Sequence, residues 1–341
     1  MNSAHDSFIT IENQIYMPMK KYTLLLIFSV FAFGSCKDDE LAFPEFNVTV
    51  DTENATGNEA GVPVFKAGTS IRFGFTGSAD MVTFYSGEPG MMYQHRDRTK
   101  LDGLPYMQFN TQIEGGTIPS GFLSVLVSTD FAGFTKAGAT DAECITRANW
   151  SDVTNQCNLP TTVTTQLSPK IDLSAYAGKP VYVAFRYVRP INTDFARYQI
   201  KNFRVRNEAD GTAYEIKTTG NAGWTAFDFN TPATGDAYLA TGGAAANRIW
   251  DFRNAAGDDR ISIGFNSQIV SNDWAITSAI DLRAVSPDLG RGIKAYSDDR
   301  LNEYQYIFNA AGTYTVSFIA SNSRYSKTNS SVKQVKVKVI N

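Results

Sequence analysis

The chain has 341 residues, of which 43% are hydrophobic and 19% charged, so it has enough apolar side chain to form folded cores and is not a disordered protein. Its net charge of −3 excludes a strongly basic protein that holds nucleic acid through phosphate contacts. The 23 phenylalanines, 16 tyrosines and 26 glycines favour β structure with tight turns, and the presence of only two histidines counts against mechanisms built on paired imidazoles.

The N-terminal region predicts export. Lys20 and Lys21 precede a short apolar run that ends in Gly34-Ser35-Cys36, which is the arrangement of a secretory signal peptide. The run is too short to span a membrane readily. The alternative to a signal peptide is a buried core helix. Its ending resembles the lipobox of bacterial lipoproteins, although Phe33 stands where that motif usually has leucine. The resemblance implies that Cys36 carries lipid and becomes the mature N-terminus.

The next four residues, Lys37-Asp38-Asp39-Glu40, resemble the surface-export signal of Bacteroidetes lipoproteins, and the alternative is a solvated linker. We therefore expect a surface-exposed lipoprotein of the outer membrane. We expect residues 1–16 to be an upstream extension, residues 17–36 the signal peptide and lipobox, and residues 37–43 a tether. Acyl chains on Cys36 would anchor the protein, and each buried methylene would add about 0.8 kcal/mol of membrane affinity.

Alternation of apolar and polar residues predicts strands near both ends of the chain. They cover residues 46–50, 70–75, 81–85, 304–308, 314–320 and 332–340. The late segment YQYIFNAAGTYTVSFIASN resembles the last hairpin of an immunoglobulin-like PKD (polycystic-kidney-disease) domain, and the early strands resemble the first half of such a domain. We expect residues 44–96 and 288–341 to form one sandwich interrupted by an insertion, because exposed loops tolerate insertions. The alternative is two incomplete sandwiches.

The middle of the chain resembles the jelly-roll modules called choice-of-anchor or cleaved-adhesin domains. The segments that carry this resemblance are LSVLVSTDF at 123–131, VYVAFRY at 181–187 and YQIKNFRV at 198–205. Alternation in the second of these puts Val181, Val183, Phe185 and Tyr187 on one face. The motif Asn272-Asp273-Trp274 comes early in these modules and late here, which indicates a permuted order. We expect residues 97–287 to be the inserted jelly roll.

The expected fold class is therefore all-β, an immunoglobulin-like sandwich interrupted by a jelly-roll sandwich. The segment FYSGEPG at 84–90, with Arg96-Asp97-Arg98-Thr99 after it, resembles domain of unknown function 5017. That resemblance implies a surface lipoprotein of gut Bacteroidetes, often encoded beside proteins of outer-membrane glycan uptake.

Two tryptophans are candidates for glycan binding. Trp224 and Trp250 stand in polar, glycine-rich segments, and aromatic faces stack on the apolar faces of sugar rings. Asp228, Asp251 and Arg253 are close in sequence and would bond sugar hydroxyls. The alternative is that both tryptophans are core residues, as we expect for Trp150 and Trp274.

Two further sites are predicted. Asp130 and Asp152, together with backbone carbonyls, would hold a structural Ca²⁺, because this hard cation prefers oxygen ligands. The alternative is that both aspartates cap turns. With Cys36 lipidated, Cys144 and Cys157 are left to form a disulfide outside the cytoplasm, the alternative being two free thiols.

The expected function is non-catalytic binding of a glycan in a polysaccharide-capture system, with no cofactor required. The partners are then a glycan or a surface protein, and the outer membrane through the anchor. A protein-binding adhesion module is the first alternative. A carboxylate glycosidase is the second, with Glu88 and Asp97 as its imagined pair, and it requires two carboxyl groups about 5–9 Å apart.

Overall fold

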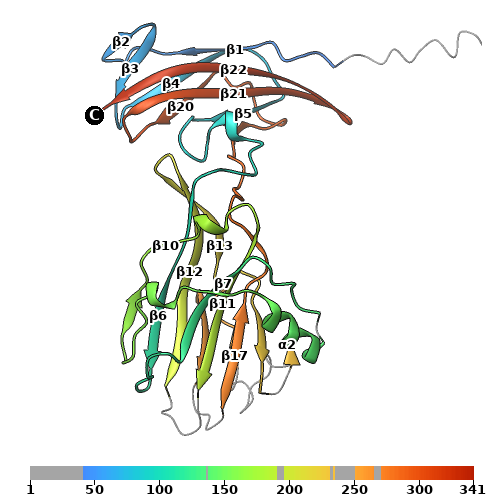
Figure 1. Ribbon diagram of the computed structural model, residues 1–341. Coiled ribbons are helices and arrows are strands. Elements are labelled where there is room, and N and C mark those ends of the chain that lie inside the picture. The colour runs from blue at the N-terminus through green and yellow to red at the C-terminus, as the bar shows by residue number, and fades with distance from the viewer. Residues whose placement is uncertain (1–40, 136, 190–195, 231–232, 235–249, 265–269) are drawn as a thin grey trace, which may run out of the picture.

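The computed structural model describes residues 41–135, 137–189, 196–230, 233–234, 250–264 and 270–341. The described chain is mostly β, in several antiparallel sheets. Figure 1 shows that strands from both ends of the chain gather in one lobe, here called the terminal lobe, whereas strands from the middle form a second, central lobe. No helix in these ranges is long and apolar enough to cross a membrane.

The terminal lobe contains a three-stranded sheet in the order β1-β4-β20 and a six-stranded sheet in the order β19-β5-β21-β22-β3-β2. Their strands are β1 (Phe46–Val50), β2 (Gly57–Glu59), β3 (Val62–Lys66), β4 (Ser70–Gly77), β5 (Met81–Tyr85), β19 (Arg291–Lys294), β20 (Glu303–Ile307), β21 (Gly312–Arg324) and β22 (Lys327–Ile340). Early and late strands share both sheets, since β20 pairs with β4 and β21 pairs with β5. Phe73, Phe84 and Phe318 join the two sheets through ring contacts of 5.3–6.4 Å.

The central lobe contains two further sheets. The first has the order β10-β6-β12-β13, with β9 and β16 attached to β6 and β12. The second has the order β15-β14-β17-β11-β7-β8, with β18 attached to β11. The elements are β6 (Leu104–Glu114), β7 (Leu123–Ser128), α2 (Gly138–Arg147), β8 (Ser151–Asp152), β9 (Thr165–Leu167), β10 (Ile171–Asp172), β11 (Pro180–Arg189), β12 (Arg197–Ala209), β13 (Thr212–Thr218), β14 (Thr225–Asp228), β15 (Ala233–Thr234), β16 (Arg260–Gly264), β17 (Ser271–Ile276) and β18 (Ile280–Asp281). Short 3₁₀ turns cover Tyr93–His95, Thr154–Gln156 and Ser174–Tyr176.

A single apolar core lies between the two sheets of the central lobe. Alternation along β11 buries Val181, Val183, Phe185 and Tyr187 there, as the sequence predicts. A smaller apolar cluster lies on the opposite face of the second sheet, where α2 packs over Trp274 and its neighbours. Both sheets therefore bury one face in the main core, and among the described residues a helix covers the other face of the second sheet alone.

The two segments that connect the lobes run side by side (Figure 1). Lys100 and Ala284 form an antiparallel bridge, and the Leu101 amide donates to the Arg283 carbonyl at 2.8 Å. Next to this pair, the buried carboxylate of Asp288 accepts hydrogen bonds from the other segment. The central lobe thus begins and ends at one place on the terminal lobe.

Candidate functional site

A line of polar side chains crosses the outer face of the first central-lobe sheet. Strand register places Gln112 of β6 opposite both Thr165 of β9 and Gln199 of β12. Gln199 in turn lies opposite Ser262 of β16, and an isolated bridge places Ser262 opposite Asp251. We call these aligned residues the polar row. Five separate segments of the chain each supply one side chain to it.

The middle residue of the polar row, Gln199, points away from the core yet is completely buried. Its strand neighbours Tyr198 and Ile200 belong to the core, and successive side chains of a strand point to opposite faces. Gln199 has 0% exposure, and neither its Nε2 nor its Oε1 has a hydrogen-bond partner in the structure. An unpartnered buried polar group costs about 1–3 kcal/mol. The fold therefore leaves the hydrogen-bonding capacity of this amide unused.

One end of the polar row carries an ion pair. The Asp251 carboxylate accepts two hydrogen bonds from the Arg253 guanidinium, at 2.9 and 2.6 Å, and one from the Arg253 amide at 3.0 Å. Burial on its own would raise the pKa of Asp251, but these bonds and the positive charges of Arg253 and Arg197 outweigh it and lower that pKa. The Asp251 carboxylate is therefore ionised and its charge is balanced.

Lys201 stands beside the middle of the polar row, two residues from Gln199 on the same strand. Its ammonium donates a hydrogen bond to Oε1 of Gln112, which is itself opposite Gln199. On the other side of Gln199, Arg197 pairs with Glu114 at 3.7 Å. The buried amide is thus bordered by one cation that has an acidic partner and one whose partner is a neutral amide.

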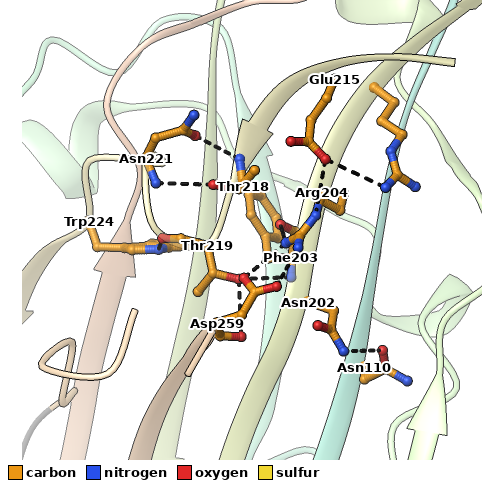
Figure 2. A network of polar contacts seen from close by, with 11 residues as sticks. Asn110, Asn202, Phe203, Arg204, Glu215, Thr218, Thr219, Asn221, Trp224 and Asp259 are labelled. Atoms are coloured by element: carbon orange, nitrogen blue, oxygen red, sulfur yellow. Dashed lines mark hydrogen bonds and ion pairs between the residues drawn. The ribbon is translucent and has the colours of Figure 1, made fainter. Parts of the chain in front are cut away.

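A β-bulge interrupts β12 directly after Lys201. Lys201 lies opposite Asn110 and Arg204 lies opposite Gln108, so β12 has one residue more than β6 in this interval. Asn202 takes up the extra length in the left-handed region, with φ of 52°. Its amide donates to the Asp259 carbonyl and its side chain donates to Asn110 (Figure 2). The bulge fixes where Lys201 stands relative to β6.

A network of charged and polar groups holds the bulge in place (Figure 2). Arg204 makes two hydrogen bonds to the Asp259 carboxylate and an ion pair with Glu215 at 3.1 Å. The side-chain hydrogen bonds from Arg204 lower the pKa of Asp259, although partial burial opposes them. The Thr219 hydroxyl accepts the Phe203 amide at 2.9 Å and thereby ties the strand after the bulge to the turn that follows β13.

Of the predicted ligand-binding residues, Asp251 belongs to the polar row and Arg253 is bonded to it, but the tryptophans are elsewhere. Trp250 is 0% exposed in the core and donates its indole N–H to the Asp273 carbonyl at 3.2 Å. Because a fully buried ring has no face open to a sugar, the prediction that Trp250 stacks on a ligand is wrong. Trp224 is half-buried against Phe185 and Phe203, so most of its ring is also core surface.

Asp228, the remaining predicted ligand-binding residue, lies on the second sheet. It is opposite Asp273 in the register of β14 and β17, on the core-facing side of the strand with Ala226. Burial, followed by the charge of Asp228, raises the pKa of Asp273 to about 8. Asp273 is therefore protonated at neutral pH and can donate to Asp228. This carboxyl pair is separated from the polar row by the core.

The predicted calcium ligands have other partners. The Asp130 carboxylate accepts bonds from the Asn149 side chain at 2.6 Å, the Asn149 amide at 2.9 Å and the Ser128 hydroxyl at 2.9 Å. Asp152 accepts the Thr154 amide at 2.9 Å. Hydrogen bonds from Asn149 are the main reason that the pKa of Asp130 is lowered. Within the described residues, no three His, Cys, Asp or Glu side chains are grouped for a metal ion.

The two cysteines predicted to form a disulfide are free thiols in the structure, so that prediction is wrong for this structure. Cys157 is buried in the main core, whereas Cys144 lies on α2, which packs on the other face of the second sheet. Burial, with the Asp152 charge as a smaller cause, raises the pKa of Cys157 to about 12, so it holds its proton. The predicted lipidation residue, Cys36, lies outside the described residues.

The two acids of the glycosidase hypothesis also have partners. Glu88 accepts a 2.5 Å hydrogen bond from the Tyr306 hydroxyl within the terminal lobe, and Asp97 pairs with Arg96 at 3.1 Å.

Sequence reasoning missed most of the polar row. Part of the signal was present, since Gln108, Asn110 and Gln112 alternate with buried residues of β6. This alternation does not predict which strands lie side by side.

The class of protein defined by these observations is a mostly β, multi-sheet protein with a polar sheet face as its candidate site. The family model named Domain of unknown function (DUF5017) matches residues 35–224, which is more than half of the chain, and the protein belongs to this family. No curated protein and no solved structure matches the chain.

Proposed function

We propose that this protein is a cell-surface lipoprotein that binds a glycan without cleaving it, and that the polar row is its binding site. The observation that carries the proposal is the alignment of polar side chains from five segments on one outer sheet face, where Gln112, Thr165 and Asp251 are at least partly exposed. Sugar hydroxyls both donate and accept, so they complement the Gln112 carboxamide in a way that a ligand with only donors or only acceptors does not. Thr165 and Asp251 extend the polar chemistry along the row.

The charges around the row favour binding over hydrolysis. A glycosidase needs a general acid whose pKa is raised. Asp251 in the row and Asp259 beside the bulge are bonded to Arg253 and Arg204, and these bonds lower their pKa values. Such carboxylates accept hydrogen bonds from sugars but hold no proton to donate at neutral pH.

The architecture fits this role if the terminal lobe lies at the membrane and the central lobe binds the ligand. We assign the terminal lobe, residues 44–96 and 288–341, as an immunoglobulin-like sandwich and residues 97–287 as an inserted jelly roll. The first described residues lie on the terminal lobe, where Asn322 donates to the Ala42 carbonyl at 3.1 Å. A lipid on Cys36 would therefore hold the terminal lobe near the membrane and leave the central lobe, with the polar row, further along the chain.

Adhesion to another protein is the second candidate, and one observation favours it. The turn of the β21–β22 hairpin presents Tyr325 with 99% exposure, next to Arg324. Exposed tyrosine and arginine are common energetic anchors of protein interfaces. Binding of this kind would use the terminal lobe, so variants of Tyr325 and of Gln112 separate the two candidates.

The test is a polysaccharide-binding screen on the full chain in detergent micelles, with plant, mucin and microbial glycans. We expect binding to one glycan class, no release of reducing ends, weaker binding by Gln112→Ala and unchanged binding by Tyr325→Ala. Release of reducing ends would show hydrolysis instead. Failure to bind any glycan, with capture of an outer-membrane protein that Tyr325→Ala abolishes, would establish the adhesion function.

A further inference from the structure

The tip of the β21–β22 hairpin presents an aromatic side chain between two cations. Arg324 and Lys327 are opposite each other in the register of the two strands, and Tyr325 and Ser326 form the turn between them. All four residues are exposed, and Tyr325 is 99% exposed. The sequence of residues 312–341, which includes both strands, contains no aspartate or glutamate. The hairpin tip therefore joins a ring and positive charge on a hairpin without acidic side chains.

The backbone of this turn is an unusual place for a tyrosine. Tyr325 lies in the left-handed region with φ of 54°, where the turns of two-residue hairpins favour glycine, asparagine and aspartate. A side chain with a Cβ raises the energy of this conformation, and at 99% exposure the ring does not pack on the core to offset it. The fold gains little from this tyrosine, which points to a use outside the fold.

The same end of the terminal lobe holds the first described residues of the chain (Figure 1). Asn322 and Asn329 are opposite each other in the hairpin. The Asn322 side chain donates to the Ala42 carbonyl at 3.1 Å, and the Asn329 side chain donates to the Leu41 carbonyl. Tyr325 is three residues beyond Asn322, which is about 10 Å along a strand. The hairpin thus binds the segment that leads back to Cys36 close to its own tip.

Covalent length limits how far this end of the lobe can be from a lipid anchor. Cys36 precedes Leu41 by five residues, and an extended chain spans at most about 3.6 Å per residue, so Leu41 lies within about 18 Å of Cys36. Phe43, two residues after Leu41, is 67% exposed. Two exposed aromatic residues therefore lie at the end of the lobe that a lipid on Cys36 would hold at the membrane.

From this arrangement we propose that the hairpin tip contacts the surface of the membrane that holds the anchor. The rings of Tyr325 and Phe43 would lie among the lipid headgroups, with Arg324 and Lys327 against lipid phosphates. Aromatic residues are enriched at membrane–water interfaces, and basic side chains are attracted to anionic headgroups. The inference rests on the lipoprotein part of the function proposed above. Tyr325 also carries the adhesion alternative, and its position beside the anchored segment favours lipid over a protein partner.

The test is quenching of tryptophan fluorescence by brominated lipid, which requires contact or near contact. The lipidated protein is reconstituted into vesicles of phosphatidylethanolamine and phosphatidylglycerol, with or without bromine on the acyl chains. We expect the emission added by Tyr325→Trp to be blue-shifted and to be quenched in the brominated vesicles. Wild type supplies the background, because its four tryptophans all belong to the core clusters of the central lobe.

Variants locate the contact. Asn341→Trp is the matched control, because it follows the other end of β22, about 40 Å along the strand from the hairpin tip. Its added emission should be the same in brominated and ordinary vesicles. Addition of Arg324→Gln and Lys327→Gln to Tyr325→Trp should reduce the quenching, and higher salt should reduce it more when the two cations are present than when they are replaced.

Mass spectrometry of Cys36 separates this inference from the function on which it rests. If the protein is lipidated and Tyr325→Trp is quenched no more than Asn341→Trp, the membrane contact is overturned and the lipoprotein stands. Capture of an outer-membrane protein that Tyr325→Ala abolishes would then assign the hairpin tip to adhesion. Absence of lipid on Cys36 would overturn both the contact and the anchor.

Discussion

The carboxylate of Asp288 and the guanidinium of Arg98 form an ion pair of 3.1 Å at the junction of the two lobes. The Asp288 side chain is 1% exposed and accepts the Met92 amide at 2.8 Å as well. The two residues belong to the two different segments that connect the lobes. The pair therefore fixes the connecting segments to each other beside the Lys100–Ala284 bridge.

Asp288→Asn should lower the free energy of unfolding by about 2 kcal/mol, since hydrogen bonds to a charged partner are worth about 1.5–3 kcal/mol and Arg98 would lose its counter-charge. Chemical denaturation measures this loss, and limited proteolysis should show faster cleavage between residues 86 and 103. Asp281→Asn is the control, because its pair with Lys100 is 47% and 63% exposed and should contribute at most about 1 kcal/mol. Equal effects of the two variants would contradict the assigned role of Asp288.

Asp273 should make the protein less stable as the pH rises from about 4 to about 8. Burial raises the pKa of Asp273 to about 8, above the 3.8 of an unperturbed aspartate. Between these values the native state holds a proton that the unfolded state has released, so unfolding becomes easier with increasing pH. The stabilising contribution of protonated Asp273 is complete below about pH 4 and is lost as the pH rises through about 8.

The measurement is urea denaturation of wild type and Asp273→Asn at pH 5 and pH 8.5. Asparagine does not ionise, so the stability difference between wild type and variant should favour wild type more at pH 5 than at pH 8.5. A difference that is the same at both pH values would show that Asp273 is ionised in the native protein.

Gln199→Leu should increase stability. Leucine removes an amide that has no partner, and the unmet cost of about 1–3 kcal/mol is the upper bound on the gain. Thermal denaturation measures the gain, and the glycan screen should find binding unchanged because the buried amide does not reach a ligand. A variant that is no more stable than wild type would show that the amide does have a partner in solution.

Trp250→Ala should lower stability by about 3–5 kcal/mol, the usual cost of truncating a buried aromatic residue. Trp224→Ala should cost less, because its ring is half-buried. Denaturant titration followed by far-UV circular dichroism compares the two. The folded fraction of each variant should bind glycan as wild type does. Selective loss of binding in a stable Trp250 variant would restore the stacking prediction.

Alternation was enough to find many strands but not their partners. The predicted bounds of residues 46–50 and 81–85 are those of β1 and β5, and the predicted core face of β11 is the buried one. Helix α2 was missed because it is short and its N-cap residue, Ala137, makes no side-chain capping bond. A helix held by tertiary packing over Trp274 leaves little local signal.

Trp250 was misread for a related reason. Its segment is rich in polar and small residues, which suggests a surface, yet Trp250 and Phe252 face the core while Asp251 and Arg253 face outward. The alignment of the polar row could not be predicted, because its members come from segments up to 150 residues apart and only the strand register brings them together. The bulge after Lys201 depends in the same way on Asp259, more than fifty residues further along the chain.

The side-by-side course of the connecting segments has a mechanical consequence. A force that pulls the central lobe away from an anchored terminal lobe loads two covalent backbones at once, each carrying part of the tension. The bonds between the segments, such as that from Leu101 to Arg283, lie across the direction of pull and are not the first to be stretched. If the protein captures long glycans at the cell surface as proposed, drag on the central lobe would reach the anchor without separating the two segments at the junction.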